Sequence, residues 1–396
     1  MQQNAQQATK CQYKGVRDKL PKWEEICQDS MLLQAIKQGA RAPIHAVPKP
    51  NMHLPPCPVD PQLTKTIGEY CAEGAMRELS RNDIRNTRYW VPIFGATKKD
   101  SHKVRLITDL RALNECHDIQ KHHPQTWKQI LQTLQNPTLQ WGITLDLRGY
   151  FNHLAVHPKT KRWMRVWYGG KGYQLEAMPF GWSMSPFWAH RMSLPIRRKM
   201  KQWGIPHCWW VDDILILGPD PDKTAQRAQQ TIRLLTELGI QINIPKSMKE
   251  PAQIFQYVGH IFNLKENTIT PIPAKREAAQ RMVQHQITSN VYTPRHMAAL
   301  AGTLLDQTKS NIALLGMPQI LMRMAAQGVR YNRSQMWYPN VQKAWSRSCP
   351  KPHQMKEFLH QALHALAQPT PRVLRPSNSA HYLLQMDASK MAWEPP

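Results

Sequence analysis

Three aspartates stand at the ends of apolar segments, where their carboxylates could bind divalent metal ions. Asp212 and Asp213 are adjacent, and they interrupt an apolar run between residues 209–211 and residues 214–217. Apolar runs on both sides of a polar pair predict two strands joined by a tight turn. Burying adjacent carboxylates is costly unless cations share their charge. The pair therefore indicates a metal site, with an ordinary surface hairpin as the structural alternative.

Asp146 supplies the third carboxylate, at the end of residues 141–146, which alternate and branch as a strand does. Magnesium prefers oxygen ligands and commonly shares them with substrate phosphates. Two such ions, about 3.5–4 Å apart, can activate an attacking oxygen and stabilise a leaving one. Carboxylates from two strand ends suit this chemistry, so two Mg²⁺ ions, or Mn²⁺ in their place, are the expected cofactors. Taken alone, Asp146 would more often cap a following helix.

The elements that must position these aspartates form an α+β pattern. Besides the aspartate strands, residues 89–114 predict a β-hairpin with a basic turn. Helices are predicted over 62–85, 124–137, 184–203 and 221–239, and the chain is mainly helical from 273 to about 328. Residues 1–60 are polar and then proline-rich, which predicts an extended entry segment.

The composition indicates a phosphate-rich partner. Lys and Arg number 52 against 27 Asp and Glu, a formal net charge of +25, which favours salt-sensitive nucleic-acid binding. No apolar stretch is expected to reach membrane-spanning length, and the N-terminus lacks the apolar core of a secretory signal, so no membrane partner is expected. The 7 cysteines form no Cys-x-x-Cys pair and predict reduced thiols in an intracellular protein. Cytoplasm or nucleus, and the oligomeric state, stay open.

Six ordered motifs over residues 89–262 resemble those of the reverse transcriptases. They are the basic hairpin, the palm segment from Asp146 to Phe151, the Pro-Phe-Gly motif at 178–186, the paired aspartates, the segment 238–247 and the hairpin at 255–260. Each match is weak alone, but their shared order is not explained by chance. The chain is most similar in character to retrotransposons, either of the long-terminal-repeat type or of the DIRS-like tyrosine-recombinase type.

The resemblance implies roles for the charged residues of these motifs. Asp146 and Asp212 are expected to be catalytic ligands of both metals, and Asp213 to support that site. Lys98 and Arg105 are expected to neutralise the nucleotide's β- and γ-phosphates through charge-assisted hydrogen bonds. A solvated basic turn is the structural alternative for Lys98 and Arg105.

The resemblance also implies a substrate pocket. Phe151 is expected to lie under the ribose and exclude a 2′-hydroxyl, although an aromatic after a strand is more often core. Phe180 and Gly181 are expected to pack under template and nucleotide, since glycine allows close backbone approach. Lys246 is expected to protonate the leaving pyrophosphate, with a plain surface lysine as the alternative.

The implied fold is an α+β right-hand polymerase, with fingers, a palm that carries an antiparallel sheet, and a helical thumb. The expected domains are an N-terminal extension (1–85), fingers and palm (86–270), thumb (271–330), connection (331–380) and a truncated ribonuclease H-like start (381–396). Asp387 belongs to a segment that resembles the first strand of ribonuclease H. Later carboxylates of such a site are absent, which implies no nuclease activity.

The expected function is that of an RNA-directed DNA polymerase from a retroelement, a nucleotidyltransferase. Its partners would be an RNA or DNA template with a primer, and deoxynucleoside triphosphates. Two other classes stay open: an inactive nucleic-acid-binding remnant, and an RNA-dependent RNA polymerase, whose palm also carries an Asp-Asp hairpin. Phe151 and the Phe180-Gly181 motif speak against the second, because ribonucleotide use needs room for the 2′-hydroxyl.

Overall fold

The computed structural model describes residues 12–49, 58–97, 104–289, 291–335, 341–350 and 355–375. The chain divides into two compact units. Unit 1 comprises residues 1–133 and 138–258, and unit 2 comprises residues 134–137 and 259–396. The domain boundaries predicted from the sequence stay predictions, and residues 381–396 lie outside the described residues.

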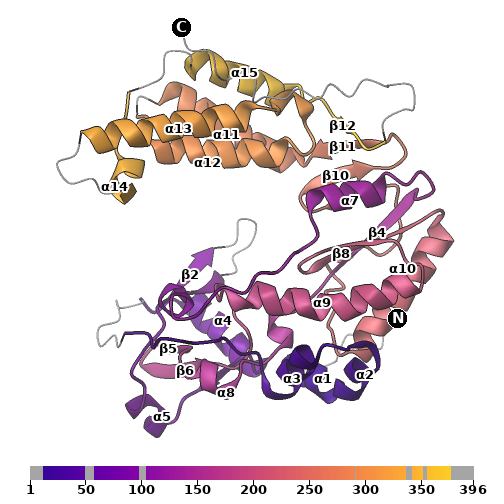
Figure 1. Cartoon of the computed structure of the whole chain (residues 1–396), viewed down its shortest axis with the longest axis vertical. Helices are drawn as coiled ribbons and strands as arrows, with labels where there is room; N and C mark the ends of the chain where they lie inside the picture. The colour runs from indigo at the N-terminus through magenta and orange to yellow at the C-terminus, as the bar shows by residue number, and fades with distance from the viewer. Residues whose placement is uncertain are drawn as a thin grey trace. The chain divides into compact units, whose positions relative to one another are not determined.

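Unit 1 contains a three-stranded antiparallel sheet with the order β4-β8-β7. Its strands are β4 (Trp141–Asp146), β7 (His207–Trp210) and β8 (Asp213–Gly218). Figure 1 labels strands β4 and β8 of this sheet. Residues 214–217 of β8 are completely buried. They are covered because α10 (Pro221–Glu237) packs on β4 and β8, while α9 (Met184–Gln202) adds Met192 and Ile196 to the same core.

Local signals explain where the helices of this core begin. Asp220 caps α10 by accepting a hydrogen bond of 2.7 Å from the Lys223 backbone N–H, and Pro221 occupies the first helical turn. The helices predicted over 184–203 and 221–239 are confirmed to within two residues. The helix predicted over 124–137 is present but shorter, as α7 (Trp127–Leu134).

The predicted β-hairpin is confirmed as β2 (Ile93–Thr97) and β3 (Val104–Thr108), which pair antiparallel and lead into α6 (Arg111–Asn114). A second sheet has the order β1-β6-β5, from β1 (Met76–Glu78), β6 (Lys171–Leu175) and β5 (Arg165–Tyr168). The prediction of one helix over 62–85 was wrong. α4 (Pro61–Ala72) stops before Gly74, whose φ is +73°, and α5 (Arg81–Arg85) starts only after β1 has paired with β6.

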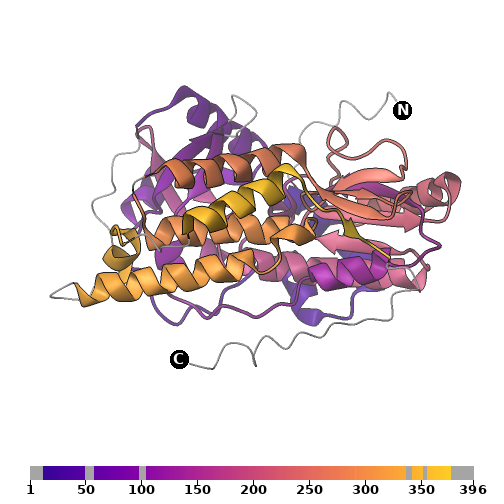
Figure 2. The same cartoon turned by 90° about the horizontal axis from the view of Figure 1, so that it is seen from above.

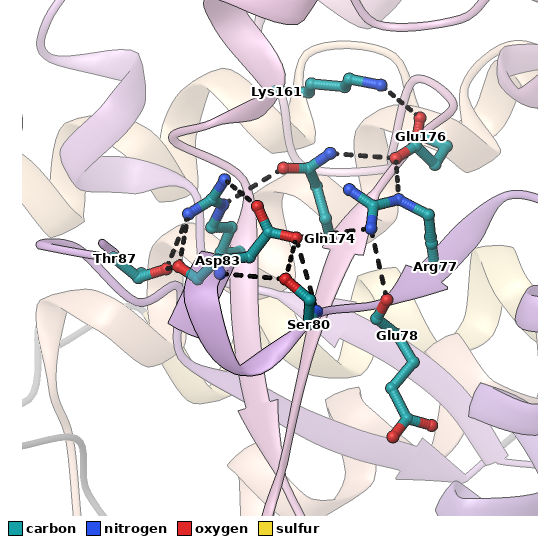
Figure 3. Close-up of polar contacts among 9 residues, drawn as sticks. Arg77, Glu78, Ser80, Asp83, Thr87, Lys161, Gln174 and Glu176 are labelled. Carbon is teal, nitrogen blue, oxygen red and sulfur yellow. Dashed lines mark hydrogen bonds and ion pairs between the residues drawn. The ribbon is translucent and has the colours of Figure 1, made fainter. Parts of the chain in front are cut away.

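A polar network holds this second sheet to α5 and to α8 (Pro158–Lys161), as Figure 3 shows. The Glu176 carboxylate accepts hydrogen bonds from Lys161, Gln174 and Arg77. The Arg77 guanidinium (Nη1) also lies 3.6 Å from the Asp83 carboxylate (Oδ2), which takes part in the N-terminal cap of α5. Burial raises the pKa of Glu176, but the hydrogen bonds from Lys161, Gln174 and Arg77, together with the charge of Lys161, hold that pKa below its ordinary value.

The N-terminal residues 12–38 are helical, so the prediction of an extended entry segment was wrong there. They form α1 (Gln12–Asp18), α2 (Leu20–Ile26) and α3 (Ser30–Gln38). The prediction rested on the polar composition of this segment, which nevertheless contains a few apolar side chains. Two of them, Trp23 and Leu32, are completely buried in the core of unit 1. The Trp23 indole N–H donates to the Leu238 carbonyl oxygen at 2.9 Å, which ties this segment to the end of α10.

Unit 2 is mainly helical after Pro273, as predicted. Figures 1 and 2 show four of its helices side by side: α11 (Pro273–Thr288), α12 (Pro294–Gln307), α13 (Met317–Ser334) and α15 (Met355–Ala367). Their core includes Leu304, Leu321 and Leu359. The remaining elements are β10 (His260–Asn263), β11 (Thr268–Pro271), β12 (Arg372–Val373), η2 (Ile312–Leu314) and α14 (Val341–Ser346).

The segment Ile312–Ser334, which contains α13, is the one described segment long and apolar enough to cross a membrane by length and composition. The sequence-based statement that no stretch reaches this length was therefore wrong. Leu321 and Ala325 of α13 lie in the core of unit 2. A core helix fits the same length and composition.

Candidate active site

The paired aspartates lie at a hairpin whose backbone is strained. Trp210 pairs with Asp213, so Val211 and Asp212 alone connect β7 to β8. Val211 has a φ of +53°, a left-handed conformation that β-branched residues rarely adopt. The Trp209 indole N–H donates to the Val211 carbonyl oxygen at 2.8 Å and holds this turn. Such strain is typical of functional sites that the surrounding structure fixes.

Asp146 and Asp213 are direct partners in the antiparallel register of β4 and β8. The Leu147 N–H donates to the Asp212 carbonyl oxygen at 2.8 Å, which makes Asp146 and Asp213 a non-hydrogen-bonded pair. Side chains at such positions share one face and approach each other more closely than at hydrogen-bonded positions. The structure therefore brings the carboxylates of two distant motifs to one end of the β4-β8-β7 sheet.

The electrostatics of this group indicate a need for positive charge. Burial, with repulsion from Asp212 and Asp146, raises the pKa of Asp213 to about 6. Burial also raises the pKa of Asp212, and the Asp146 carboxylate adds to that effect. The exposed Lys246 acts in the opposite direction on both pKa values, so it lies within electrostatic reach of the pair.

Oxygen ligands that repel one another are the donor set a hard cation such as Mg²⁺ prefers. The chemistry of Asp146, Asp212 and Asp213 therefore fits a metal site. In the described part of the chain, no three His, Cys, Asp or Glu side chains converge on a single ion position. The metal site stays a prediction.

A second group of predicted residues surrounds the Pro-Phe-Gly motif. Phe151 lies in η1 (Tyr150–His153), and its ring centroid is 4.8 Å from that of Phe180. Phe151 is buried, whereas Phe180 is 52% exposed. The φ of Gly181 is +89°, a backbone conformation that favours glycine, and a Cβ there would lie only 3.0 Å from the Thr108 carbonyl oxygen. The Thr108 hydroxyl donates to the Phe180 carbonyl oxygen at 3.0 Å.

Asn114, which belongs to the basic-hairpin motif but had no role predicted for it, fixes the same loop. Its side-chain N–H donates to the Gly181 carbonyl oxygen at 2.8 Å. Its side-chain oxygen accepts hydrogen bonds of 3.0 Å from the Ser183 backbone N–H and hydroxyl. Its place in the basic-hairpin motif was the one available signal. No local pattern in the sequence connects Asn114 with Gly181 or Ser183, which lie far along the chain.

The two residues predicted to contact phosphates come from the basic hairpin. Arg105 is exposed on β3, opposite Ala96 and on the same strand as Thr108. Lys98 lies outside the described residues. Their roles stay predictions.

Comparison with known proteins agrees with the geometry. The family model "Reverse transcriptase (RNA-dependent DNA polymerase)" matches residues 96–262. Protein P of duck hepatitis B virus is 24% identical over 226 residues, which cover 55% of this chain and 26% of the viral protein. The Gag-Pol polyprotein of walleye dermal sarcoma virus is 24% identical over 181 residues, which cover 46% of this chain and 10% of the polyprotein. The chain thus spans about a quarter or less of the length of these relatives.

Solved structures show the same fold at low sequence identity. The foamy viral protease-reverse transcriptase in complex with double-stranded DNA superposes with a TM-score of 0.63 and 14% identity, over 90% of this chain and 60% of that one. Its complex with an RNA/DNA hybrid superposes with a TM-score of 0.60 and 15% identity, over 89% of this chain and 46% of that one. The predicted α+β right-hand polymerase fold is confirmed. Over residues 96–262 the chain is similar to the reverse transcriptase family.

Proposed function

We propose that this chain is an RNA-directed DNA polymerase, which adds deoxynucleotides to a primer 3′ end on an RNA or DNA template. The observation that carries the proposal is the register that pairs Asp146 with Asp213, next to Asp212, at one end of the β4-β8-β7 sheet, with the three carboxylates within electrostatic reach of one another. The match to the reverse transcriptase family supports the choice of reaction.

Asp146, Asp212 and Asp213 would hold two Mg²⁺ ions, with Mn²⁺ as a substitute. When bound, such ions stabilise the attacking and leaving oxygens of a phosphoryl transfer. The protein's part would be to orient three carboxylates in a partly buried site, where bound metal would favour their ionised forms. The strained Val211 turn and the register of β4 with β8 support that orientation.

The incoming deoxynucleotide would lie between the basic hairpin and Phe151. Lys98 and Arg105 would bind its β- and γ-phosphates, and Lys246 would donate a proton to the leaving pyrophosphate. Phe151 would exclude the 2′-hydroxyl, because its contact with Phe180 limits where its ring can move. Gly181 would let template or nucleotide approach the backbone closely.

A primer–template duplex is the proposed partner, and the net charge of +25 supports it. The likeness to foamy viral enzymes that were solved with double-stranded DNA and with an RNA/DNA hybrid is consistent with such a duplex. A retroelement of the long-terminal-repeat or DIRS-like kind is the proposed source, and an intracellular site its proposed location. The proposed ribonuclease H-like start lies outside the described residues.

Primer extension on an RNA template with deoxynucleotides and Mg²⁺ tests the proposal. The Asp212→Asn/Asp213→Asn double variant should lose extension, whereas Asp222→Asn, which removes an exposed carboxylate from the first turn of α10, should keep it. Salt-sensitive duplex binding without extension by the unaltered chain would instead favour the inactive remnant.

A further inference from the structure

The backbone of Asp146 is held from the side of β4 that does not face β8. Because Asp146 and Asp213 form a non-hydrogen-bonded pair, the N–H and carbonyl groups of Asp146 point away from β8. Both groups bind residues 241–248, here called the flanking loop. The Asn243 N–H donates to the Asp146 carbonyl oxygen at 2.7 Å, and the Asp146 N–H donates to the Ser247 hydroxyl oxygen at 3.0 Å.

The single hydroxyl group of Ser247 links the Asp146 backbone to the flanking loop. While it accepts from the Asp146 N–H, its own O–H donates to the Asn243 carbonyl oxygen at 3.0 Å. A hydroxyl can make both bonds at once, whereas alanine can make neither. Without the hydroxyl, the Asp146 N–H would lose its partner at the strand end that carries the carboxylate.

The flanking loop is itself anchored at both ends, so Ser247 has a fixed position. At one end, the Gln241 carbonyl oxygen accepts from the Arg148 N–H at 2.9 Å. At the other end, the Met248 N–H donates to the Thr144 carbonyl oxygen at 2.9 Å. The loop therefore lies along β4 on both sides of Asp146.

A buried histidine strengthens the first anchor. The Gln241 N–H donates to Nε2 of His153 at 2.9 Å, and Nδ1 of the same ring lies 3.0 Å from the Tyr150 carbonyl oxygen. Burial lowers the pKa of His153 to about 4, so the ring is neutral near pH 7 and Nε2 accepts while Nδ1–H donates.

We propose that Ser247 is a positioning residue, whose hydrogen bond to the Asp146 N–H holds the Asp146 carboxylate opposite Asp213 for metal binding. The inference rests on the proposed polymerase function and adds a residue to its metal site. Groups that orient metal ligands from outside the coordination shell typically change metal affinity or activity by about 10–100-fold when removed. If the hydroxyl had only a structural role, its removal would change the stability of the protein and leave its metal affinity unchanged.

The test compares Ser247→Ala and Ser247→Thr with a matched control in the full chain. Ser193→Ala is the control, because the buried Ser193 hydroxyl also donates to a backbone carbonyl, that of His190 at 2.7 Å, but within α9. Two quantities are measured for each variant: Mn²⁺ affinity by electron paramagnetic resonance without nucleotide, and the Mg²⁺ concentration that gives half-maximal primer extension.

Ser247→Ala should weaken Mn²⁺ binding and raise the half-maximal Mg²⁺ concentration by about tenfold. Ser247→Thr keeps a hydroxyl and should stay near the unaltered chain in both measurements, as should Ser193→Ala. Equal metal affinity in Ser247→Ala and Ser193→Ala would overturn the inference, whatever their melting temperatures. If Ser247→Ala does not fold, Ser247→Cys carries the same test, because sulfur is a weak acceptor in a side chain of similar size.

The Mn²⁺ measurement keeps the two proposals apart. An unaltered chain that binds Mn²⁺ at this site but extends no primer contradicts the polymerase function, while the comparison of serine variants still decides the role of Ser247. An unaltered chain that extends primers, with Ser247→Ala unchanged in metal affinity, contradicts only the positioning role.

Discussion

Asp146 and Asp213 face each other across β4 and β8 as a non-hydrogen-bonded pair, although they belong to separate motifs. Burial, with repulsion from Asp212 and from Asp146, raises the pKa of Asp213 to about 6. Two carboxylates in this relationship are poorly stable without a cation. A bound cation would relieve this repulsion, which links the pair to the proposed reaction.

The first prediction concerns the pH dependence of metal use. Bound metal requires ionised carboxylates, so a proton on Asp213 competes with Mg²⁺ below about pH 6. The Mg²⁺ concentration that gives half-maximal primer extension should therefore rise as the pH falls from 7.5 to 6. Below pH 6 the rise should approach about tenfold for each pH unit. A half-maximal Mg²⁺ concentration that is constant over this range would contradict the role of Asp213.

The second prediction concerns the stability of the metal-free chain. The folded-state pKa of Asp213 lies above its ordinary value of 3.8, so the folded protein binds this proton more tightly than the unfolded protein. The contribution of Asp213 to folding stability should therefore increase as the pH falls from above 6 toward 3.8. Asp213→Asn should raise the melting temperature at pH 8 with a metal chelator present, and Asp222→Asn should not.

The third prediction concerns sugar selection. Phe151→Val should admit ribonucleotides, because the smaller side chain leaves room for a 2′-hydroxyl. The ratio of kcat/KM for ribonucleotide over deoxynucleotide should rise by at least about tenfold. Phe187→Val serves as control, since Phe187 is also buried but packs on Trp188 within α9. An equal change in both variants would show loosened packing and not a sugar contact.

The fourth prediction concerns Asn114. Asn114→Ala removes the hydrogen bonds to Gly181 and Ser183, each worth about 1 kcal/mol. If the Gly181 loop contacts template or nucleotide, the KM for nucleotide should rise several-fold. Ser183→Ala leaves the bond to the Gly181 carbonyl oxygen intact and should change the KM less. Steady-state kinetics on one primer–template distinguish the two variants.

The hairpin that carries Asp212 and Asp213 could be predicted from the sequence because its signals are local. Asp212 and Asp213 interrupt a run of strand-forming residues, and the strands on either side are present. The register that places Asp213 opposite Asp146 is a tertiary property, so only the resemblance between motifs indicated it. Gly181 was predicted to let template or nucleotide approach the backbone, and that role stays a prediction. Its positive φ gives a separate, local reason for glycine at this position.

Other parts could not be predicted because long-range contacts decide them. The helices over 12–38 depend on burial of Trp23, whose indole bonds to Leu238 far along the chain. Ser247 and Asn114 are short polar residues that fit any loop, and only the backbone groups they meet distinguish them. The end of α4 near Gly74 was also missed, because pairing of β1 with β6 overrides the helical pattern that continues through Leu79.

The most direct test of the central claim measures Mn²⁺ affinity and primer extension for Asp146→Asn, Asp213→Asn and their combination. Because both carboxylates are proposed to share one site, each single variant should lose most of the binding and extension, and the double variant should lose little more. Asp222→Asn should match the unaltered chain. Unchanged Mn²⁺ affinity and extension in Asp146→Asn would contradict the claim that these aspartates form the metal-dependent polymerase centre.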